Sequence, residues 1–234
     1  MNDYQTYLIT GASKGIGREV AIRLATQDKT IGLVARSEEE LCEVAKEIES
    51  KGAKARVYPA DLTETGVCHQ LINELHSEWG HIDVLFNNAG FLDAGSVAEL
   101  DLEKFDQMLD LNVRAMVHLS RRCAELMVDK KKGAIINLAS IAGVESMAGL
   151  SGYCATKFAA RAFSEATFKD VRKYGIKVSA ICPGYVATNM SADFDLDSQK
   201  MIQPCDIADA VEYILKSSHT ACPREIHIMP QQEQ

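Results

Sequence analysis

The sequence predicts an α/β fold in which helices cover both faces of a doubly wound parallel sheet of about seven strands. The first observation behind this prediction is that short apolar runs alternate with helical patterns along the chain. The second is a glycine-rich turn that joins the first apolar run to the first helical pattern. The third is the lack of a linker, repeat or low-complexity tract, which indicates a single domain over residues 1–234.

The expected strands are short apolar runs bounded by turns or helical patterns. They cover residues 7–9, 31–35, 55–58, 82–86, 134–138, 176–181 and 225–229. The expected helices repeat apolar residues at helical spacing over residues 16–24, 41–48, 67–79, 103–128, 153–174 and 206–215. A capping box from Ser37 to Glu40 starts the second helix, and Gly175 ends the fifth. Right-handed crossovers between such strands favour the doubly wound arrangement.

The composition excludes several classes of protein. The chain is 47% hydrophobic and 25% charged, as globular proteins are. No apolar run approaches about 18 residues, and residues 1–5 lack the parts of a signal peptide, so we expect a cytoplasmic protein that binds no membrane. A net charge of −8 argues against nucleic acid as a partner. Seven scattered cysteines without metal-ligand spacing indicate reduced thiols and no metal site.

The glycine-rich turn at residues 10–17 reads T-G-A-S-K-G-I-G and is predicted to hold a dinucleotide pyrophosphate at a helix N-terminus. Gly11 permits the sharp turn, Gly15 lets the backbone approach the phosphates, and Gly17 allows the helix to pack closely on the sheet. The spacing is G-x-x-x-G-x-G and not the general G-x-G-x-x-G. The cofactor-binding residues expected here are Gly11, Ser13, Lys14, Gly15, Ile16 and Gly17.

The residues after the second and third strands indicate which dinucleotide binds. An acidic residue after the second strand would accept from a ribose hydroxyl of NAD, but Arg36 stands there. Arg36 and Lys14 supply two cations for a 2′-phosphate, so the sequence predicts NADP(H). Asp61 and Leu62 follow the third strand, where the Asp61 carboxylate suits either the adenine amino group or a helix cap.

Five further motifs follow in order along the chain. Tyr153 and Lys157 form a Y-x-x-x-K pair, and Ser140 lies upstream at the end of a strand. The remaining motifs are Asn87-Asn88-Ala89-Gly90 after the fourth strand, Leu111-Asn112-Val113 in the long helix and Pro183-Gly184-Tyr185-Val186-Ala187-Thr188 after the sixth strand. Together with the glycine loop, these motifs resemble the short-chain dehydrogenase/reductase family, which has a Rossmann-like fold, over residues 10–188.

The chemistry of carbonyl reduction explains the first of these motifs. A tyrosine with a pKa of about 10 is a poor proton donor at neutral pH. Tyr153 and Lys157 are four residues apart on one helix face, so the ammonium group is expected to lower the tyrosine pKa. Ser140 is placed to hydrogen-bond the substrate oxygen, Lys157 to hold ribose hydroxyls, and Asn112 to hold a water that relays protons. The resemblance implies the same four roles, with Tyr153 as acid in reduction and base in oxidation.

The resemblance also implies further cofactor contacts. The backbone of Asn88, Ala89 and Gly90 would line the adenine ribose, and Val113 would pack near the adenine. The turn at Pro183 and Gly184 would lie under the nicotinamide, whose carboxamide would be held by the Val186 amide and the Thr188 hydroxyl. The resulting set is Asn88, Ala89, Gly90, Val113, Pro183, Gly184, Val186 and Thr188, together with Tyr153 and Lys157.

The substrate and the assembly are less constrained. A short polar segment over about 189–204 is expected to cover the substrate, with walls from Phe91, Asp93, Ala94, Ile141, Glu145, Met147, Leu150, Tyr185 and Met190. The helices over 104–128 and 153–173 carry apolar and small residues on more than one face, and this pattern, like the resemblance, favours a homodimer or homotetramer.

Three functions remain open. The first is an NADPH-dependent reductase of a small ketone, aldehyde or hydroxy acid, or the reverse reaction. The second is a 3-oxoacyl thioester reductase whose acidic carrier would dock on a basic patch formed by Lys130, Lys131, Lys132, Arg172 and Lys173. The third is a dinucleotide-binding regulator without turnover, against which the intact Asn112, Ser140, Tyr153 and Lys157 argue.

Overall fold

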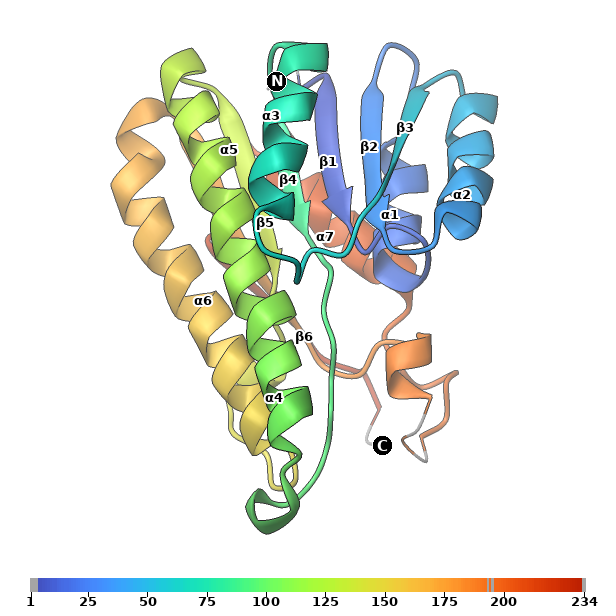
Figure 1. Ribbon diagram of the computed structural model, residues 1–234, viewed down its shortest axis with the longest axis vertical. Helices are drawn as coiled ribbons and strands as arrows, with labels where there is room; N and C mark the ends of the chain where they lie inside the picture. Colours follow the sequence, from blue (N-terminus) through green and yellow to red (C-terminus); the bar gives the residue numbers. More distant parts are fainter. Residues whose placement is uncertain (1–3, 193, 195, 233–234) are drawn as a thin grey trace.

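The computed structural model describes residues 4–192, 194 and 196–232 (Figure 1). Seven strands form one sheet in the order β3-β2-β1-β4-β5-β6-β7, and every neighbouring pair is parallel. The order reverses at β1, which is the switch point of a doubly wound Rossmann-like sheet. The predicted fold class is therefore confirmed.

The elements match the predicted order. The strands are β1 (Thr6–Thr10), β2 (Thr30–Ala35), β3 (Lys54–Pro59), β4 (Val84–Asn87), β5 (Gly133–Leu138), β6 (Ile176–Pro183) and β7 (Glu225–Ile228). The α-helices are α1 (Gly15–Leu24), α2 (Glu38–Ser50), α3 (Val67–Trp79), α4 (Leu102–Met108), α5 (Met116–Lys130), α6 (Ser151–Val171) and α7 (Pro204–Lys216). The Ser37 hydroxyl accepts from the Glu40 amide at 3.3 Å and caps α2, as its sequence predicts.

Two hydrophobic cores lie on the two faces of the sheet. Helices α1, α2 and α7 cover one face, where Val20, Leu41 and Ile207 are fully buried. Helices α3 and α5 and the end of α6 cover the other face, where Leu75 and Leu119 are buried. The central strands are buried on both sides, which explains why they are continuous apolar runs in the sequence.

One predicted helix is interrupted. In place of a regular helix over 103–128, α4 is followed by a π-helical segment, η2 (Leu109–Ala115), and then by α5. A π-helical segment shifts the hydrogen-bond pattern without breaking the helix, and such segments are frequent at functional sites. Asn112 lies in the middle of this segment, so the backbone is irregular at a predicted catalytic residue.

The carboxyl ends of the parallel strands all lie at one end of the sheet, in the lower half of Figure 1. The segments that follow β1, β4, β5 and β6 all leave the sheet at this end, and they carry the glycine turn, Asn88–Gly90, Ser140 and Gly184–Thr188. Open parallel sheets bind ligands at the carboxyl ends of their strands, near the point where the strand order reverses. Among the described residues, no helix is both long and apolar enough to cross a membrane.

Candidate active site

The loop between β1 and α1 has the shape that a pyrophosphate requires. Gly11 and Gly15 have φ angles of +62° and +57°, a region that side chains rarely tolerate. A Cβ at Gly17 would press against the carbonyl oxygen of Gly11 and lie 2.6 Å from Nδ2 of Asn88. The three glycines are therefore required by this backbone, and the half-buried Ser13 and Ile16 complete the turn at the N-terminus of α1.

Asn88 fastens this loop to the neighbouring strand. Its Nδ2 donates to the carbonyl oxygens of Thr10 and Gly11 at 2.9 and 3.1 Å. In return, the Oγ1 of Thr10 accepts from the amides of Asn88 and Ala89 at 3.0 Å each. The sequence predicted only backbone contacts for Asn88, and this bracing by Asn88 and Thr10 was missed.

Of the two cations predicted to bind a 2′-phosphate, Lys14 is the N-cap residue of α1 and Arg36 directly follows β2. Lys14 and Arg36 are both exposed, and within the described part of the chain neither side chain forms a hydrogen bond or an ion pair. Asp61 accepts from the amide and the hydroxyl of Thr63 at 2.9 and 2.6 Å. These bonds and the nearby Arg36 charge lower the pKa of Asp61 below its ordinary value. Asp61 thus stabilises the turn before α3, whose own N-cap is Gly66.

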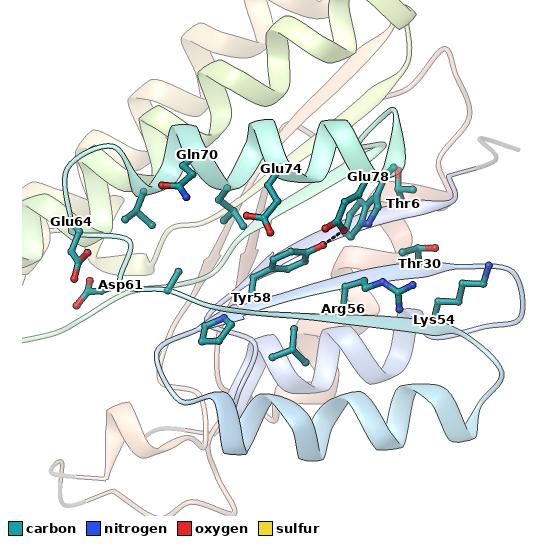
Figure 2. A pocket seen from close by; sticks show the side chains of 16 residues that line it. Thr6, Thr30, Lys54, Arg56, Tyr58, Asp61, Glu64, Gln70, Glu74 and Glu78 are labelled. Atoms are coloured by element: carbon teal, nitrogen blue, oxygen red, sulfur yellow. Dashed lines mark hydrogen bonds between the residues drawn. The ribbon is translucent and has the colours of Figure 1, made fainter.

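Figure 2 shows a broad hollow between β3 and α3, with Asp61 and Glu64 at one end and Thr6 at the other. Its side chains are mostly polar, and Tyr58 donates to the Glu78 carboxylate at 2.8 Å across it. The hollow lies at the β3 edge of the sheet, whereas the catalytic candidates lie beyond β1 and β4. Of the predicted cofactor residues, it contains Asp61.

The catalytic candidates meet where β5 and β6 end. Tyr153 and Lys157 lie on α6 and are both buried, and the Lys157 Nζ is 5.5 Å from the centroid of the Tyr153 ring. Lys157 donates to the carbonyl oxygen of Leu138 at 2.9 Å, which fixes its ammonium group at the end of β5. Ser140 lies two residues further on, and its Oγ accepts from the Ala142 amide at 3.1 Å.

Burial decides the protonation of the pair in this structure. It raises the pKa of Tyr153 above its ordinary value, although a hydrogen bond with Ser140 opposes the rise. It lowers the pKa of Lys157 from 10.5 to about 8. The expected lowering of the Tyr153 pKa by Lys157 is therefore wrong for the protein alone, because desolvation disfavours the charged form of both groups. The phenol remains protonated, as a proton donor must be.

Asn112 connects the helix to the loop after β4. Its Nδ2 donates to the Phe91 carbonyl oxygen at 2.8 Å and to Oγ1 of Thr156 at 3.1 Å, and its Oδ1 accepts from the Phe91 amide at 2.8 Å. Both amide hydrogens are thereby used, so a water at this side chain would have to donate to the second lone pair of Oδ1 or bind the main chain of Asn112. Asn112 and Lys157 line one small cavity with Leu62 and Ala89. Val113, the next residue of the same segment, is half-buried.

The segment after β6 forms the opposite wall. Pro183, Gly184, Val186 and Thr188 line the same pocket as Ser140, Tyr153 and Lys157, together with Ile16, Asn88 and Gly90 of the cofactor set. The Ser191 hydroxyl donates to the carbonyl oxygens of Val186 and Thr188 at 2.6 and 2.9 Å, which closes a turn beneath the pocket. The predicted cofactor and catalytic residues thus converge from β1, β4, β5 and β6.

The predicted substrate walls are brought together only in part. Five of them line the pocket: Ile141, Met147, Leu150, Tyr185 and Met190. Phe91, Asp93, Ala94 and Glu145 do not, since Asp93 pairs with Lys104 at 2.8 Å and Glu145 is exposed. Leu92, Ser191 and Phe194 line it unexpectedly, and Phe194 packs against Tyr185 with ring centroids 5.1 Å apart. In the covering segment, residues 193 and 195 lie outside the described residues.

Cys182 belongs to a separate side-chain cluster at the β7 edge. Donor atoms of Cys182, Glu225 and His227 lie within 4.8 Å of one another, although the sequence predicted no metal site. Oε2 of Glu225 accepts from Arg161 at 2.7 Å, so a guanidinium already compensates this carboxylate. Burial raises the pKa of the Cys182 thiol to about 12. In this cluster Glu225 is thus paired with Arg161, and the Cys182 thiol is neutral.

Related proteins align with this chain over nearly its whole length. The family model described as short chain dehydrogenase matches residues 5–199. An uncharacterized oxidoreductase of Staphylococcus epidermidis is 33% identical over 223 residues, which cover 95% of this chain and 96% of the relative. An uncharacterized oxidoreductase of Staphylococcus saprophyticus is 33% identical over 224 residues, with the same coverage of both chains.

Solved structures agree in fold. A metagenomic short-chain oxidoreductase in complex with NADP is 28% identical, with a TM-score of 0.86 and 98% of each chain covered. An NAD+-bound xylitol dehydrogenase is 26% identical, with a TM-score of 0.85, and 96% of this chain and 97% of the other are covered. The two neighbours hold different dinucleotides, so the likeness alone selects neither. By its family model, its relatives and its fold, the chain belongs to the short-chain dehydrogenase/reductase family.

Proposed function

We propose that the protein is an NADP(H)-dependent oxidoreductase that reduces a carbonyl to an alcohol or catalyses the reverse reaction. The observation that carries this proposal is the convergence of Ser140, Tyr153 and Lys157, two of them buried, beside the glycine loop. When bound, the nicotinamide dinucleotide supplies or accepts the hydride. The residues of this chain bind the substrate oxygen, stabilise its charge and move the proton.

In the proposed reduction, the Tyr153 phenol donates its proton to the carbonyl oxygen. The Ser140 hydroxyl donates a hydrogen bond to the same oxygen while its negative charge develops. The Lys157 ammonium group, positioned by the Leu138 carbonyl, stabilises the phenolate that remains. The small cavity between Lys157 and Asn112 offers a path for a water that returns the proton.

The test of this chemistry is Tyr153→Phe. The variant keeps the buried ring and loses only the hydroxyl, so we expect it to fold and bind NADPH but to lose nearly all turnover. Thermal unfolding and NADPH fluorescence control for folding and binding. Substantial remaining turnover in a panel of ketones, aldehydes and acetoacetyl thioesters would show that another group supplies the proton.

The proposed preference for NADP(H) is supported by the exposed Lys14 in the glycine turn and the exposed Arg36 directly after β2. Charge-assisted hydrogen bonds contribute about 1.5–3 kcal/mol, so Arg36→Asp is expected to weaken NADPH binding about 10- to 100-fold and favour NADH. Arg56→Asp, an equal change of charge at an exposed residue of β3, is the matched control. Equal losses in both variants would assign the effect to net charge alone.

Nothing specific favours a carrier-linked thioester reductase. The basic groups do come together, because Lys130–Lys132 precede β5 while Arg172 and Lys173 precede β6, its neighbour. However, this is the amino end of the strands, and the catalytic residues lie at their carboxyl end. A carrier on this patch would be at the wrong end of the sheet, and Lys132 is already paired with Asp83 at 3.0 Å.

We also propose a homo-oligomer of a cytoplasmic protein. On α6, Ala155, Ala162 and Ala166 are exposed next to Phe158, which is 38% exposed. A two-fold contact between such faces would bury them. Light scattering should show a dimer or tetramer, and Phe158→Arg should dissociate it. The seven unpaired cysteines agree with a reducing compartment.

A further inference from the structure

The substrate side of the active-site pocket is apolar. Six side chains form this apolar wall, and they come from the loop after β4, the segment before α6 and the segment after β6. They are Leu92, Met147, Leu150, Tyr185, Met190 and Phe194. The Tyr185 and Phe194 rings pack against each other at 58° and form one continuous surface. Met190 lies at the mouth and is 43% exposed.

Several polar groups that line the pocket are already bonded within the protein. The Asn88 amide holds the glycine loop, and the Ser191 hydroxyl donates to the Val186 and Thr188 carbonyl oxygens. Among the described residues that line the pocket, Lys157 alone is charged, and it donates to the Leu138 carbonyl oxygen. The Ser140 hydroxyl donates to the Pro183 carbonyl oxygen at 3.5 Å and would have to turn from it to bind the reacting oxygen beside Tyr153. The hydroxyls of Tyr185 and Thr188 also belong to the lining.

The charged side chains near the pocket turn away from it. Asp93 pairs with Lys104 at 2.8 Å, and Glu145 is exposed outside the lining. No arginine belongs to the lining formed by described residues. A carboxylate or phosphate on the substrate would thus leave water for an apolar wall, and the one cation of the described lining, Lys157, is already fixed at the Leu138 carbonyl oxygen. Burying an unpaired charge is strongly unfavourable.

We infer that the substrate is a neutral carbonyl compound with apolar substituents, and that the apolar wall discriminates against anionic substrates. This inference rests on the proposed reductase function and narrows it. It removes the oxo and hydroxy acids from the small carbonyl compounds and alcohols that the sequence allows. The wall selects by desolvation and not by a specific hydrogen bond, so apolar substituents of different shape are expected to be accepted.

The experiment compares three compounds with the same ketone. They are ethyl 3-oxobutanoate, 3-oxobutanamide and the 3-oxobutanoate anion, reduced with NADPH at neutral pH. The amide has the shape of the anion without its charge, so it separates charge from size. We expect kcat/KM to fall from ester to amide, and the anion to be at least about 100-fold below the ester. Equal values for ester and anion would overturn the inference.

A binding measurement removes the intrinsic reactivity of the three ketones. Calorimetry with the Tyr153→Phe variant and NADPH measures affinity without turnover, and the ester is expected to bind at least about 10-fold more tightly than the anion. If no carbonyl compound is turned over by the wild-type protein, the proposed function fails, while this measurement still decides the inference about the wall. Tighter binding of the anion than of the ester would contradict it.

Met190 offers a matched pair of variants, since it lies at the mouth and outside the catalytic machinery. Met190→Arg places a cation at the apolar wall and is expected to raise kcat/KM for the anion about 10-fold, with little gain for the ester. Met190→Gln, of similar size but neutral, is expected to leave the anion poor. An equal gain from both variants would show that shape and not charge excludes the anion.

Discussion

Lys157, proposed above to take part in catalysis, is expected to lower the free energy of unfolding of the protein. Burial lowers its pKa from 10.5 to about 8, and this difference corresponds to about 3 kcal/mol against the charged form in the folded state. Lys157→Met removes that penalty but also removes the donor to the Leu138 carbonyl oxygen, a loss of about 1–3 kcal/mol. At neutral pH we expect the variant to be roughly 1 kcal/mol more stable and to be inactive.

The dependence on pH is the sharper test. Below pH 8 the lysine is protonated in both folded and unfolded protein, so the full penalty is present. Between pH 8 and 10.5 the unfolded protein binds more protons than the folded one, so the wild type gains stability as pH rises. The advantage of the variant should therefore shrink by about 2.5 kcal/mol between pH 7 and pH 10.

Urea unfolding of both proteins without cofactor at several pH values measures this difference. Lys46→Met on α2 is the control, since Lys46 is exposed and its replacement removes the same charge from the surface. A stability difference between wild type and Lys157→Met that stays constant from pH 7 to pH 10 would refute the argument from burial.

Three further outcomes are expected. Gly17→Ala would push α1 away from Gly11, so we expect a loss of about 1–3 kcal/mol in urea unfolding and a larger loss of NADPH affinity; unchanged binding would contradict the close packing. Lys131→Gly should raise the melting temperature by about 2–4 °C, because Lys131 ends α5 with a φ angle of +53° that glycine adopts freely; a lower melting temperature would argue against this. The Gln5 amide and Lys132 hold the pKa of buried Asp83 below its ordinary value despite burial, so its contribution to stability is lost as pH falls through that lowered pKa. Asp83→Asn should flatten this acid limb of the stability curve, and an identical limb would exclude Asp83 as its source.

The fold is readable from the sequence because its signals are local. Strands buried on both faces are continuous apolar runs, and each helix shows its own periodicity. The break at Asn112 is not local in this sense, since a π-helical turn shifts hydrogen bonds while the apolar spacing stays close to that of an α-helix. The partners of Asn112 in this segment, Phe91 and Thr156, are distant in sequence, so local spacing does not indicate the interruption.

The sequence predicts which residues form the site, but it does not predict their burial, their pKa changes or all of the side chains around them. Motif order identifies Tyr153 and Lys157, yet the direction of their pKa changes depends on how many apolar groups surround them. Phe194 and Leu92 line the pocket because of how their loops are folded, and loops show no periodicity in the sequence from which this could be predicted. Asp93 and Glu145 are close in sequence to the pocket and still point elsewhere, because Lys104 and solvent offer them better surroundings.

The bonds between Asn88, Thr10 and the glycine loop have a consequence for the thermodynamics of cofactor binding. A loop that is already braced loses little conformational entropy when phosphates arrive, because that entropy was lost when the chain folded. The association should therefore show a small heat-capacity change that reflects buried cofactor surface rather than loop ordering. Loosening the loop would turn the same contacts into a binding event coupled to folding, with weaker affinity for an unchanged set of phosphate contacts.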